Sequence, residues 1–330
     1  MKLPRRRFLH LVAGAAALPA LSRVALAQTY PTRPITLIVP FAAGGATDVM
    51  ARILADHMSR TLGQRLIIEN VVGAGGTIGS TRTMRAKPDG YTLEQGTLGT
   101  HAAAVAFYPS LAYRPDIDFE PIGLVEEGAV LIVGRKGLPP NDLKEFVSYA
   151  RANPEKLNVA HAGVGSSTHL SCLLLSSVLG VKPTMVPFNG SAPAMNAVIA
   201  GQVDYMCSAI SDVIQQVQGG TIKVYAIGTA DRSPALPNVP TAKEAGLPEF
   251  QASGWTALFA PRGTPKPILD KLADALDKAL DDENTRKRLI DIGIDVPGKA
   301  RRGREPLAAL VKSEIARWTP IIKAANIKGE

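Results

Sequence analysis

The chain has 330 residues, of which 46% are hydrophobic and 20% charged, and its formal net charge is +8. Residues 1–27 hold five of the basic residues and no acidic one, so the rest of the chain carries 32 basic against 29 acidic residues. This small excess argues against a nucleic-acid-binding protein. The remaining length is sufficient for two domains of ordinary size.

Residues 1–27 have the pattern of an export signal. Basic residues from Lys2 to Arg7 precede an apolar stretch at 8–21, and the small-residue sequence Ala25-Leu26-Ala27 follows. The apolar stretch is shorter than the roughly 20 residues that span a bilayer, so we expect cleavage after Ala27 rather than a membrane anchor. The arginine run is typical of twin-arginine export, with a general secretory signal as the alternative. Both routes predict a bacterial periplasmic protein.

Residues 35–52 read as a strand, a small-residue loop and a helix. The run Ile35 to Val39 is short and rich in branched residues, which is typical of a buried parallel strand. Gly44 and Gly45 let the backbone come close to a ligand, and Thr47 or Asp48 is a natural N-cap. Free N–H groups at a helix start can bind a carboxylate or phosphate. Alternatively, the segment is an ordinary turn that binds nothing.

A second strand at 65–72 ends in a glycine cluster at 73–79. Its spacing does not fit G-x-G-x-x-G, because the third glycine of that motif falls on Ile78. A dinucleotide site is therefore not predicted. A further strand ends in a polar segment containing Thr97, Thr100 and His101, which we expect at the same rim. His101 has no evident acid partner or nucleophile, so a place at a helix start or pocket wall is favoured over a catalytic base.

Residues 157–179 repeat the strand, small-residue loop and helix of the opening segment. The loop at 163–167 leads into an apolar helix from Thr168 to Leu179, and Ser166, Ser167 and Thr168 add hydroxyl donors to the helix amides. This set suits a carboxylate oxygen, although the hydroxyls could simply cap the helix. The sequence lacks G-x-S-x-G, so a hydrolase nucleophile elbow is not indicated.

Two long extended segments, 119–133 and 250–261, are predicted to cross between domains. We therefore expect an α/β clamshell whose two lobes each contain a mainly parallel sheet flanked by helices. The predicted domains are 28–128 together with 254–330, and an inserted domain at 129–253. Apolar stripes in two C-terminal helices should cover the first domain. They comprise Ile268, Leu269, Leu272, Leu276 and Leu280, followed by Leu307, Leu310, Val311, Ile315 and Trp318.

The two cysteines are Cys172, in the apolar helix, and Cys207, in a strand-like segment. The predicted compartment would permit a disulfide. Two buried thiols are the favoured interpretation, because a domain with a substantial core does not need the crosslink.

The sequence resembles the periplasmic solute receptors of tripartite tricarboxylate transporters, also called the Bug family. The resemblance covers essentially all of the chain after the signal, with many short matches in the same order. These include Val39-Pro40-Phe41, Gly73-Ala74-Gly75-Gly76, Lys87-Pro88-Asp89-Gly90-Tyr91, Gly201-Gln202-Val203-Asp204, Arg232-Ser233-Pro234 and Ala260-Pro261-Arg262-Gly263-Thr264-Pro265.

The resemblance implies a non-catalytic receptor that binds a small carboxylate between two lobes, without metal or cofactor. The implied binding residues on one lobe are Phe41, Ala43, Gly44, Gly45 and Asp48, with Thr97, Thr100 and His101 as secondary candidates. Those on the other lobe are Gly163, Gly165, Ser166, Ser167 and Thr168. The family would pair this receptor with integral membrane transporter subunits, and a monomer is expected. A receptor that signals to a sensor kinase is an alternative, and a periplasmic hydrolase is a weaker one.

Two departures from the family pattern bear on the ligand. Asn189 stands where relatives usually have Lys, after Phe188 in place of Tyr, and Cys207-Ser208 replaces a frequent Phe-Asp. We expect Asn189 and Ser208 at the rim, where the loss of a cation and an anion should alter which distal group is accepted.

Overall fold

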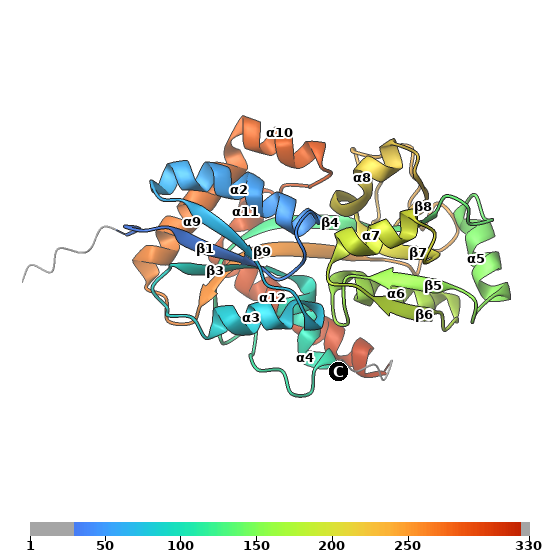
Figure 1. The fold of residues 1–330 in the computed structure, drawn as a ribbon, viewed down its shortest axis with the longest axis horizontal. Helices are drawn as coiled ribbons and strands as arrows, with labels where there is room; N and C mark the ends of the chain where they lie inside the picture. The colour runs from blue at the N-terminus through green and yellow to red at the C-terminus, as the bar shows by residue number, and fades with distance from the viewer. Residues whose placement is uncertain (1–29, 325–330) are drawn as a thin grey trace, which may run out of the picture.

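A computed structural model describes residues 30–324 of the chain. The predicted signal peptide and its cleavage site lie outside these residues. In Figure 1 the described chain forms two halves side by side, crossed by two long strands. We call the half that contains β1 to β3 lobe 1 and the half that contains β5 to β8 lobe 2.

The strands form a nine-stranded mixed sheet in the order β2-β1-β3-β9-β4-β7-β5-β6, with β8 also paired to β4. Parallel pairing joins β1 to β2 and β3 in lobe 1, and β5 to β6 and β7 in lobe 2. The strands are β1 (Ile35–Val39), β2 (Leu66–Asn70), β3 (Thr92–Thr97), β4 (Phe119–Arg135), β5 (Asn158–His161), β6 (Thr184–Pro187), β7 (Tyr205–Ala209), β8 (Ile222–Ile227) and β9 (Ser253–Pro261).

The long strands β4 and β9 connect the lobes, as the two extended segments predicted. They pair antiparallel from Phe119 with Pro261 to Ala129 with Ser253. Beyond that point β4 continues into lobe 2, where it pairs with β7 and β8. The second segment becomes a strand only at Ser253, because Phe250 is buried in a turn closed by its N–H to Leu247 O.

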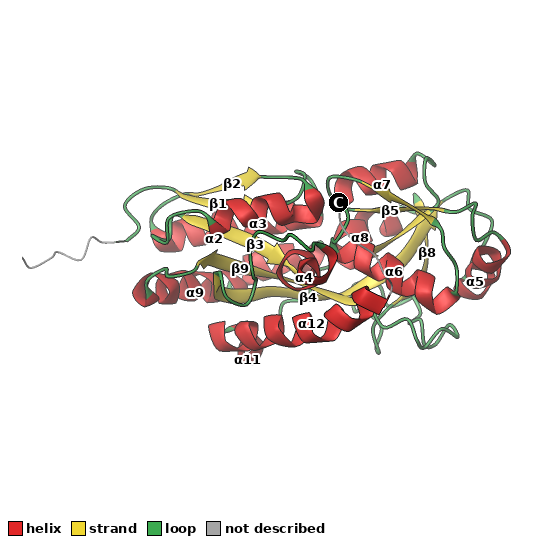
Figure 2. Ribbon diagram, turned by 90° about the horizontal axis from the view of Figure 1, so that it is seen from below, coloured by secondary structure: helices red, strands yellow, loops and turns green. Residues whose placement is uncertain are grey.

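Helices cover both faces of the sheet in each half (Figure 2). Lobe 1 carries α2 (Ala46–Leu62), α3 (Thr77–Met84), α4 (Ala104–Phe107), α9 (Lys266–Asp281), α10 (Glu283–Asp291), α11 (Lys299–Arg302) and α12 (Arg304–Ala324), together with the short helical turns η1 (Ala74–Gly76) and η2 (Gly99–Ala103). Lobe 2 carries α5 (Leu143–Ala152), α6 (Ser167–Leu179), α7 (Ser191–Ile199) and α8 (Ile210–Gln218). Asp142 caps α5 by accepting the N–H of Glu145.

The apolar stripes of the C-terminal helices pack into lobe 1 as predicted. Leu269, Leu272, Leu276 and Leu280 of α9 are buried in one cluster with β1 and α2. Leu307, Val311 and Trp318 of α12 are buried in another cluster with η2 and β9, whereas Leu310 and Ile315 are only partly covered. Lobe 2 has its own two clusters, one of which contains Cys172 and Cys207. Both cysteines are buried free thiols, and the N–H of Cys207 donates to Cys172 Sγ at 3.2 Å.

Candidate functional site

The loop after β1 leads into α2, but the helix begins earlier than the sequence indicated. Ala46 is its first residue and Gly45 its N-cap, so neither Thr47 nor Asp48 has that role. Asp48 lies in the first helical turn, where it accepts the N–H of Gly44 at 3.0 Å and forms two hydrogen bonds of 2.9 Å with Arg52. Burial favours the neutral acid, but the hydrogen bonds from Arg52 and Gly44 outweigh it and lower the pKa of Asp48. Asp48 therefore orders the loop.

The start of α6 presents three hydroxyl groups at the opposite side of the lobe interface. Ser166 is the N-cap and accepts the N–H of His169 at 3.2 Å. The Thr168 hydroxyl accepts the N–H of Ala162 at 2.8 Å and lies 3.0 Å from the Ser166 hydroxyl. Ser167 Oγ accepts the N–H of Gly99, which belongs to lobe 1. These residues thus cap the helix and border the interface at the same time.

Several contacts that involve main-chain carbonyl groups close the lobes on each other. Ala42 N–H donates to Asn189 O at 2.9 Å, and Tyr108 Oη donates to Val164 O. A Cβ added to Gly75 would lie 1.9 Å from Val164 O, so only glycine permits this approach. The structure therefore has the closed form of a two-lobed receptor.

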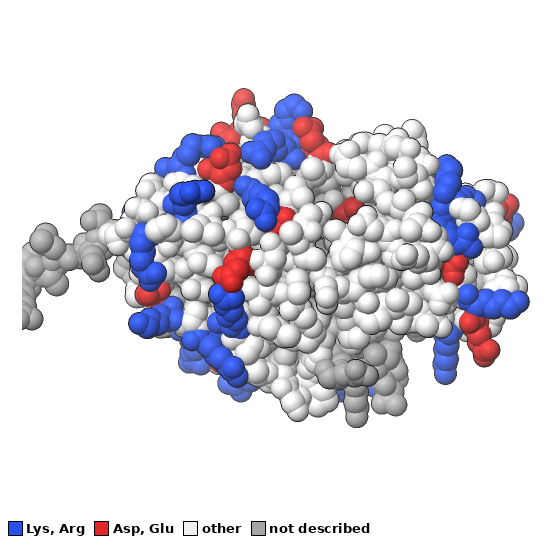
Figure 3. All heavy atoms as spheres, viewed as in Figure 1, with Lys and Arg blue, Asp and Glu red and all other residues white. Residues whose placement is uncertain are grey.

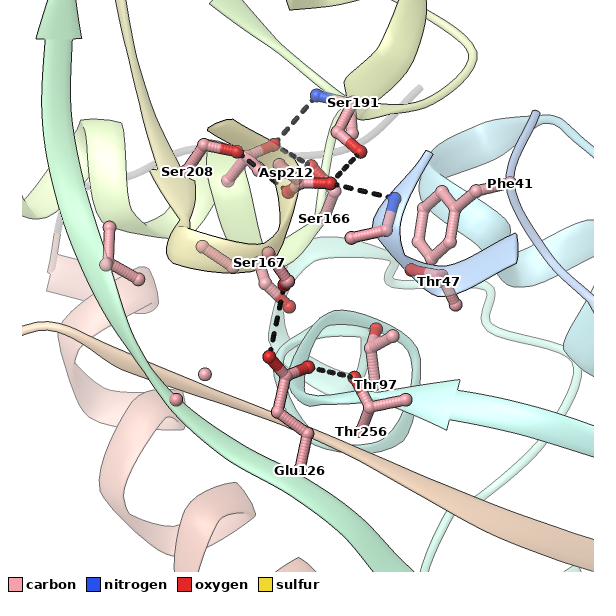
Figure 4. Close-up of a pocket in the computed structure, with 18 of the residues that line it drawn as sticks. Phe41, Thr47, Thr97, Glu126, Ser166, Ser167, Ser191, Ser208, Asp212 and Thr256 are labelled. Atoms are coloured by element: carbon pink, nitrogen blue, oxygen red, sulfur yellow. Dashed lines mark hydrogen bonds between the residues drawn. The ribbon is translucent and has the colours of Figure 1, made fainter. Parts of the chain in front are cut away.

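A cavity of about 70 Å³ lies between the closed lobes. This exceeds the roughly 10–15 Å³ that one water molecule requires, so several waters or a small ligand can be accommodated. Figure 4 shows the polar side chains that surround it. The predicted site residues in its wall are Phe41, Thr97, Ser166, Ser167, Thr168 and Ser208.

The other predicted loop residues lie outside the wall of this cavity. They are Ala43, Gly44, Gly45, Asp48, Gly163, Gly165 and Asn189. The amides of Gly44 and Gly165 already have partners in the helix that follows each loop, Asp48 Oδ2 and His169 Nδ1. Gly163 and Asn189 line a separate depression between the lobes, next to η1. Asn189 is absent from the wall of the first cavity. Having asparagine here in place of the lysine usual in relatives therefore removes no cation from that wall.

Thr100 and His101 are fully buried in lobe 1 and do not line the cavity. The His101 ring stacks on Phe259 at a centroid distance of 3.9 Å and meets Phe119 edge-on. Its Nδ1 lies 2.9 Å from Thr100 Oγ1. Burial lowers the pKa of His101 to about 3, so its imidazole is neutral at ordinary pH. The structure thus places this pair in the core beneath the cavity, a place the polar sequence around them did not reveal.

Sequence reasoning missed Asp212, which reaches the cavity from the first turn of α8. Its carboxylate accepts the hydroxyls of Ser191 and Ser208, the latter at 2.8 Å, and the N–H of Ala46 at 3.1 Å (Figure 4). Burial raises its pKa, and these hydrogen bonds oppose that rise. The sequence predicted that an acidic group is lost at Ser208. Asp212, four residues further along the chain, places a carboxyl group in the cavity wall instead.

The second missed residue is Glu126, in the polar middle of β4. Its carboxyl group accepts the hydroxyls of Ser211 at 3.1 Å and Thr256 at 3.3 Å (Figure 4). Burial, reinforced by the negative charge of Asp212, raises the pKa of Glu126 to about 7. The signal in the sequence was the pair Glu126-Glu127 in the polar middle of a long apolar segment. Neighbouring strand residues point to opposite faces, so one of these two acids has to face inward.

The cavity wall has no basic side chain. Within residues 30–324, the lining includes two carboxyl groups and several hydroxyls but no lysine, arginine or histidine. On the face shown in Figure 3, charged side chains gather over the two ends of the molecule, and the zone between the lobes is largely uncharged. Among the same residues, no group of three or more His, Cys, Asp or Glu side chains could hold a metal ion. No described helix is both long and apolar enough to cross a membrane.

A two-lobed α/β fold with a cavity between its lobes, bordered by hydroxyl and carboxyl groups, defines a solute-binding receptor of the periplasmic type. A family model described as "Tripartite tricarboxylate transporter family receptor" matches residues 50–327, and the chain belongs to this family. The family consists of solute-binding receptors rather than enzymes.

Three similar proteins illustrate the relationship. The solved structure of MatC from Rhodopseudomonas palustris with bound malate is 52% identical, with a TM-score of 0.86, and the match covers 89% of this chain and 100% of that one. The periplasmic binding protein BugD is 40% identical with a TM-score of 0.87, over 91% of this chain and all of its own. A UPF0065 protein of the TAR-I ttuE-ttuC' intergenic region in Agrobacterium vitis is 39% identical over 97% of this chain and 92% of its own length.

Proposed function

We propose that this protein is a periplasmic receptor that binds a small organic acid in the cavity between its lobes and delivers it to a membrane transporter. The observation that carries the proposal is the cavity at the start of α6, where Ser166, Ser167 and Thr168 combine hydroxyl groups with a helix N-terminus. Such a site favours a carboxylate without needing a basic side chain.

The proposal assigns the chain to two lobes that close on the ligand. Residues 28–128 and 254–330 form lobe 1, and residues 129–253 form lobe 2. The separate hydrophobic clusters of the two halves and the crossing strands β4 and β9 support this division. The malate in MatC supports the choice of an organic acid as the ligand. The membrane partner would be the integral subunits of a tripartite tricarboxylate system.

Ligand-induced stabilisation tests the binding function. Calorimetry and thermal unfolding with acetate, succinate, malate and citrate should identify at least one ligand. A ligand at about 100 times its Kd should add about 2.7 kcal/mol to the free energy of unfolding. The absence of a response to every acid by the folded protein would contradict the proposal.

A cavity-filling variant tests where the acid binds. Gly254 lines the cavity, its backbone needs no positive φ, and a Cβ added there meets no atom within 4 Å. Gly254→Leu should therefore abolish binding while the fold is retained. Gly298→Leu is the matched control, because Gly298 also has open space around it but lies outside the cavity. Equal affinity in both variants would place the site elsewhere.

Uptake into proteoliposomes that contain the transporter subunits, with and without the receptor, tests delivery.

A further inference from the structure

Two carboxyl groups face the cavity from different elements. Glu126 comes from the crossing strand β4 and Asp212 from α8 in lobe 2, and Figure 4 shows them on different sides of the pocket. Glu126 is only 6% exposed, and Asp212 lies close enough for its charge to affect Glu126. A cavity expected to hold an anion thus has two acids in its wall.

The hydrogen bonds of these acids leave acceptor positions unfilled. An ionised carboxylate has about four lone-pair positions. Glu126 accepts two hydrogen bonds within the protein, and Asp212 accepts three. Unused acceptors are therefore concentrated on Glu126, which is fixed in place by Ser211 and Thr256. A ligand group that donates hydrogen bonds would fill the unused acceptor positions of both carboxyl groups.

The donors for the ligand's carboxylate lie at the start of α6, where Ser166, Ser167 and Thr168 line the cavity. Trp255 also lines the cavity, but its indole nitrogen is buried and is not offered to the ligand. The cavity thus combines hydroxyl groups at α6 with acceptors at Glu126 and Asp212.

The group of the ligand that contacts Glu126 or Asp212 should be a hydrogen-bond donor. With no basic side chain in the wall, a carboxylate at this place would meet a like charge. A hydroxyl or a protonated amine there meets an acceptor instead, and an unsubstituted acid has no such donor to offer.

We propose that Glu126 and Asp212 form a subsite for a hydrogen-bond-donating substituent of the ligand, so that the receptor selects hydroxy or amino acids over the unsubstituted acid of equal length. This inference rests on the proposed function and specifies its ligand. Hydroxy acids and amino acids both have a hydrogen-bond donor close to a carboxylate. The experiments below distinguish a hydroxyl donor from an ammonium donor.

Succinate, malate and aspartate provide the test, because they share a four-carbon dicarboxylate skeleton and differ in one substituent. Calorimetry on the full mature protein should give malate or aspartate at least about tenfold tighter binding than succinate, since an acceptor left without a partner disfavours the analogue that lacks the donor. Equal affinity for all three would overturn the inference while the proposed function stood. If none of the three, nor any other acid, bound the folded protein, the proposed function itself would fail.

Variants of Glu126 assign the preference to this residue. Glu126→Leu should reduce the ratio of malate or aspartate affinity to succinate affinity towards one. Glu126→Gln should reduce a preference for aspartate more than one for malate, because the amide keeps an acceptor but loses the charge. Glu127→Gln is the matched control, because Glu127 is next to Glu126 in the strand, pairs with Arg301 at 2.8 Å and is absent from the cavity wall. An unchanged ratio in Glu126→Leu would contradict the assignment. The comparison of ligands in the unmodified protein decides the inference even if this variant fails to fold.

Discussion

The backbone N–H of Ala46, at the first position of α2, donates to Asp212 of lobe 2 across the interface at 3.1 Å. The carboxylate that occupies this helix N-terminus therefore belongs to the protein. The sequence of the loop indicated an anion site here, and the structure supplies the anion from 166 residues away. The α6 side of the cavity is consequently the better place for the ligand's carboxylate.

Replacing Asp212 with alanine should open the ligand-free protein. A hydrogen bond to a charged group contributes roughly 1.5–3 kcal/mol, and this one joins the two lobes. We expect a larger radius of gyration in small-angle scattering for Asp212→Ala than for the unmodified protein. Asp116→Ala is a suitable control, because Asp116 is exposed and lines neither of the two pockets between the lobes. An unchanged radius of gyration would show that the other contacts between the lobes are sufficient to keep them closed.

Replacing Gly99 with alanine should weaken ligand binding through closure alone. A Cβ at Gly99 would lie 2.9 Å from three backbone atoms of lobe 2, Gly165 O, Ser166 Cα and Ser167 N. Its backbone conformation needs no glycine, so each lobe should keep its stability. We expect at least about a tenfold loss of affinity, equivalent to about 1.4 kcal/mol, with little change in unfolding.

Gly298→Ala serves as the control for Gly99→Ala, since a Cβ at Gly298 meets no atom within 4 Å. Unaltered affinity in Gly99→Ala would indicate that the ligand binds without this degree of closure.

Binding of an amino acid should become tighter as pH rises through about 7. Burial, together with the negative charges of Asp212 and Asp295, raises the pKa of Glu126 to about 7 in the ligand-free protein. An ammonium group favours the ionised carboxylate, lowers its pKa and so releases a proton on binding. Calorimetry in buffers of different ionisation enthalpy measures that release. Glu126→Gln should show no such dependence, and affinity that falls with rising pH would contradict the prediction.

Glu94 of β3 should make the protein less stable as pH rises. Its side chain is fully buried with Ser80 as a hydrogen-bond donor, and its Oε2 has no partner among the described residues. Burial raises its pKa from 4.5 to about 8, so between these values the folded chain keeps a proton that the unfolded chain loses. The free energy of unfolding therefore falls through this window.

Glu94→Gln tests this effect because glutamine cannot ionise. The stability of the variant relative to the unmodified protein should increase by about 1 kcal/mol or more from pH 5 to pH 8, given that each pKa unit is equivalent to about 1.36 kcal/mol. Denaturant unfolding at the two pH values measures the difference. A constant difference would mean that water solvates the Glu94 carboxyl group in the folded state.

Strand β1 could be predicted because a buried parallel strand is a short apolar run, as at Ile35–Val39. The start of α6 was also recognisable from its serine and threonine residues. Asp212 was not, because an acid near a helix start is ordinary in sequence and only the closure of the lobes brings it to Ala46. His101 was misleading for the opposite reason, since its polar neighbours conceal two phenylalanines, Phe119 and Phe259, that are distant in sequence.

The lobes meet through contacts outside the cavity wall, such as Ala42 N–H with Asn189 O and Tyr108 Oη with Val164 O. The chemistry of the cavity depends on side chains such as Ser208 and Glu126, which make none of these contacts. Asp212 belongs to both sets, because it lines the cavity and accepts the N–H of Ala46. The scaffold is therefore suited to engineering as a biosensor, in which the recognised acid is changed at β4 and β7 while the closing movement that reports binding is retained.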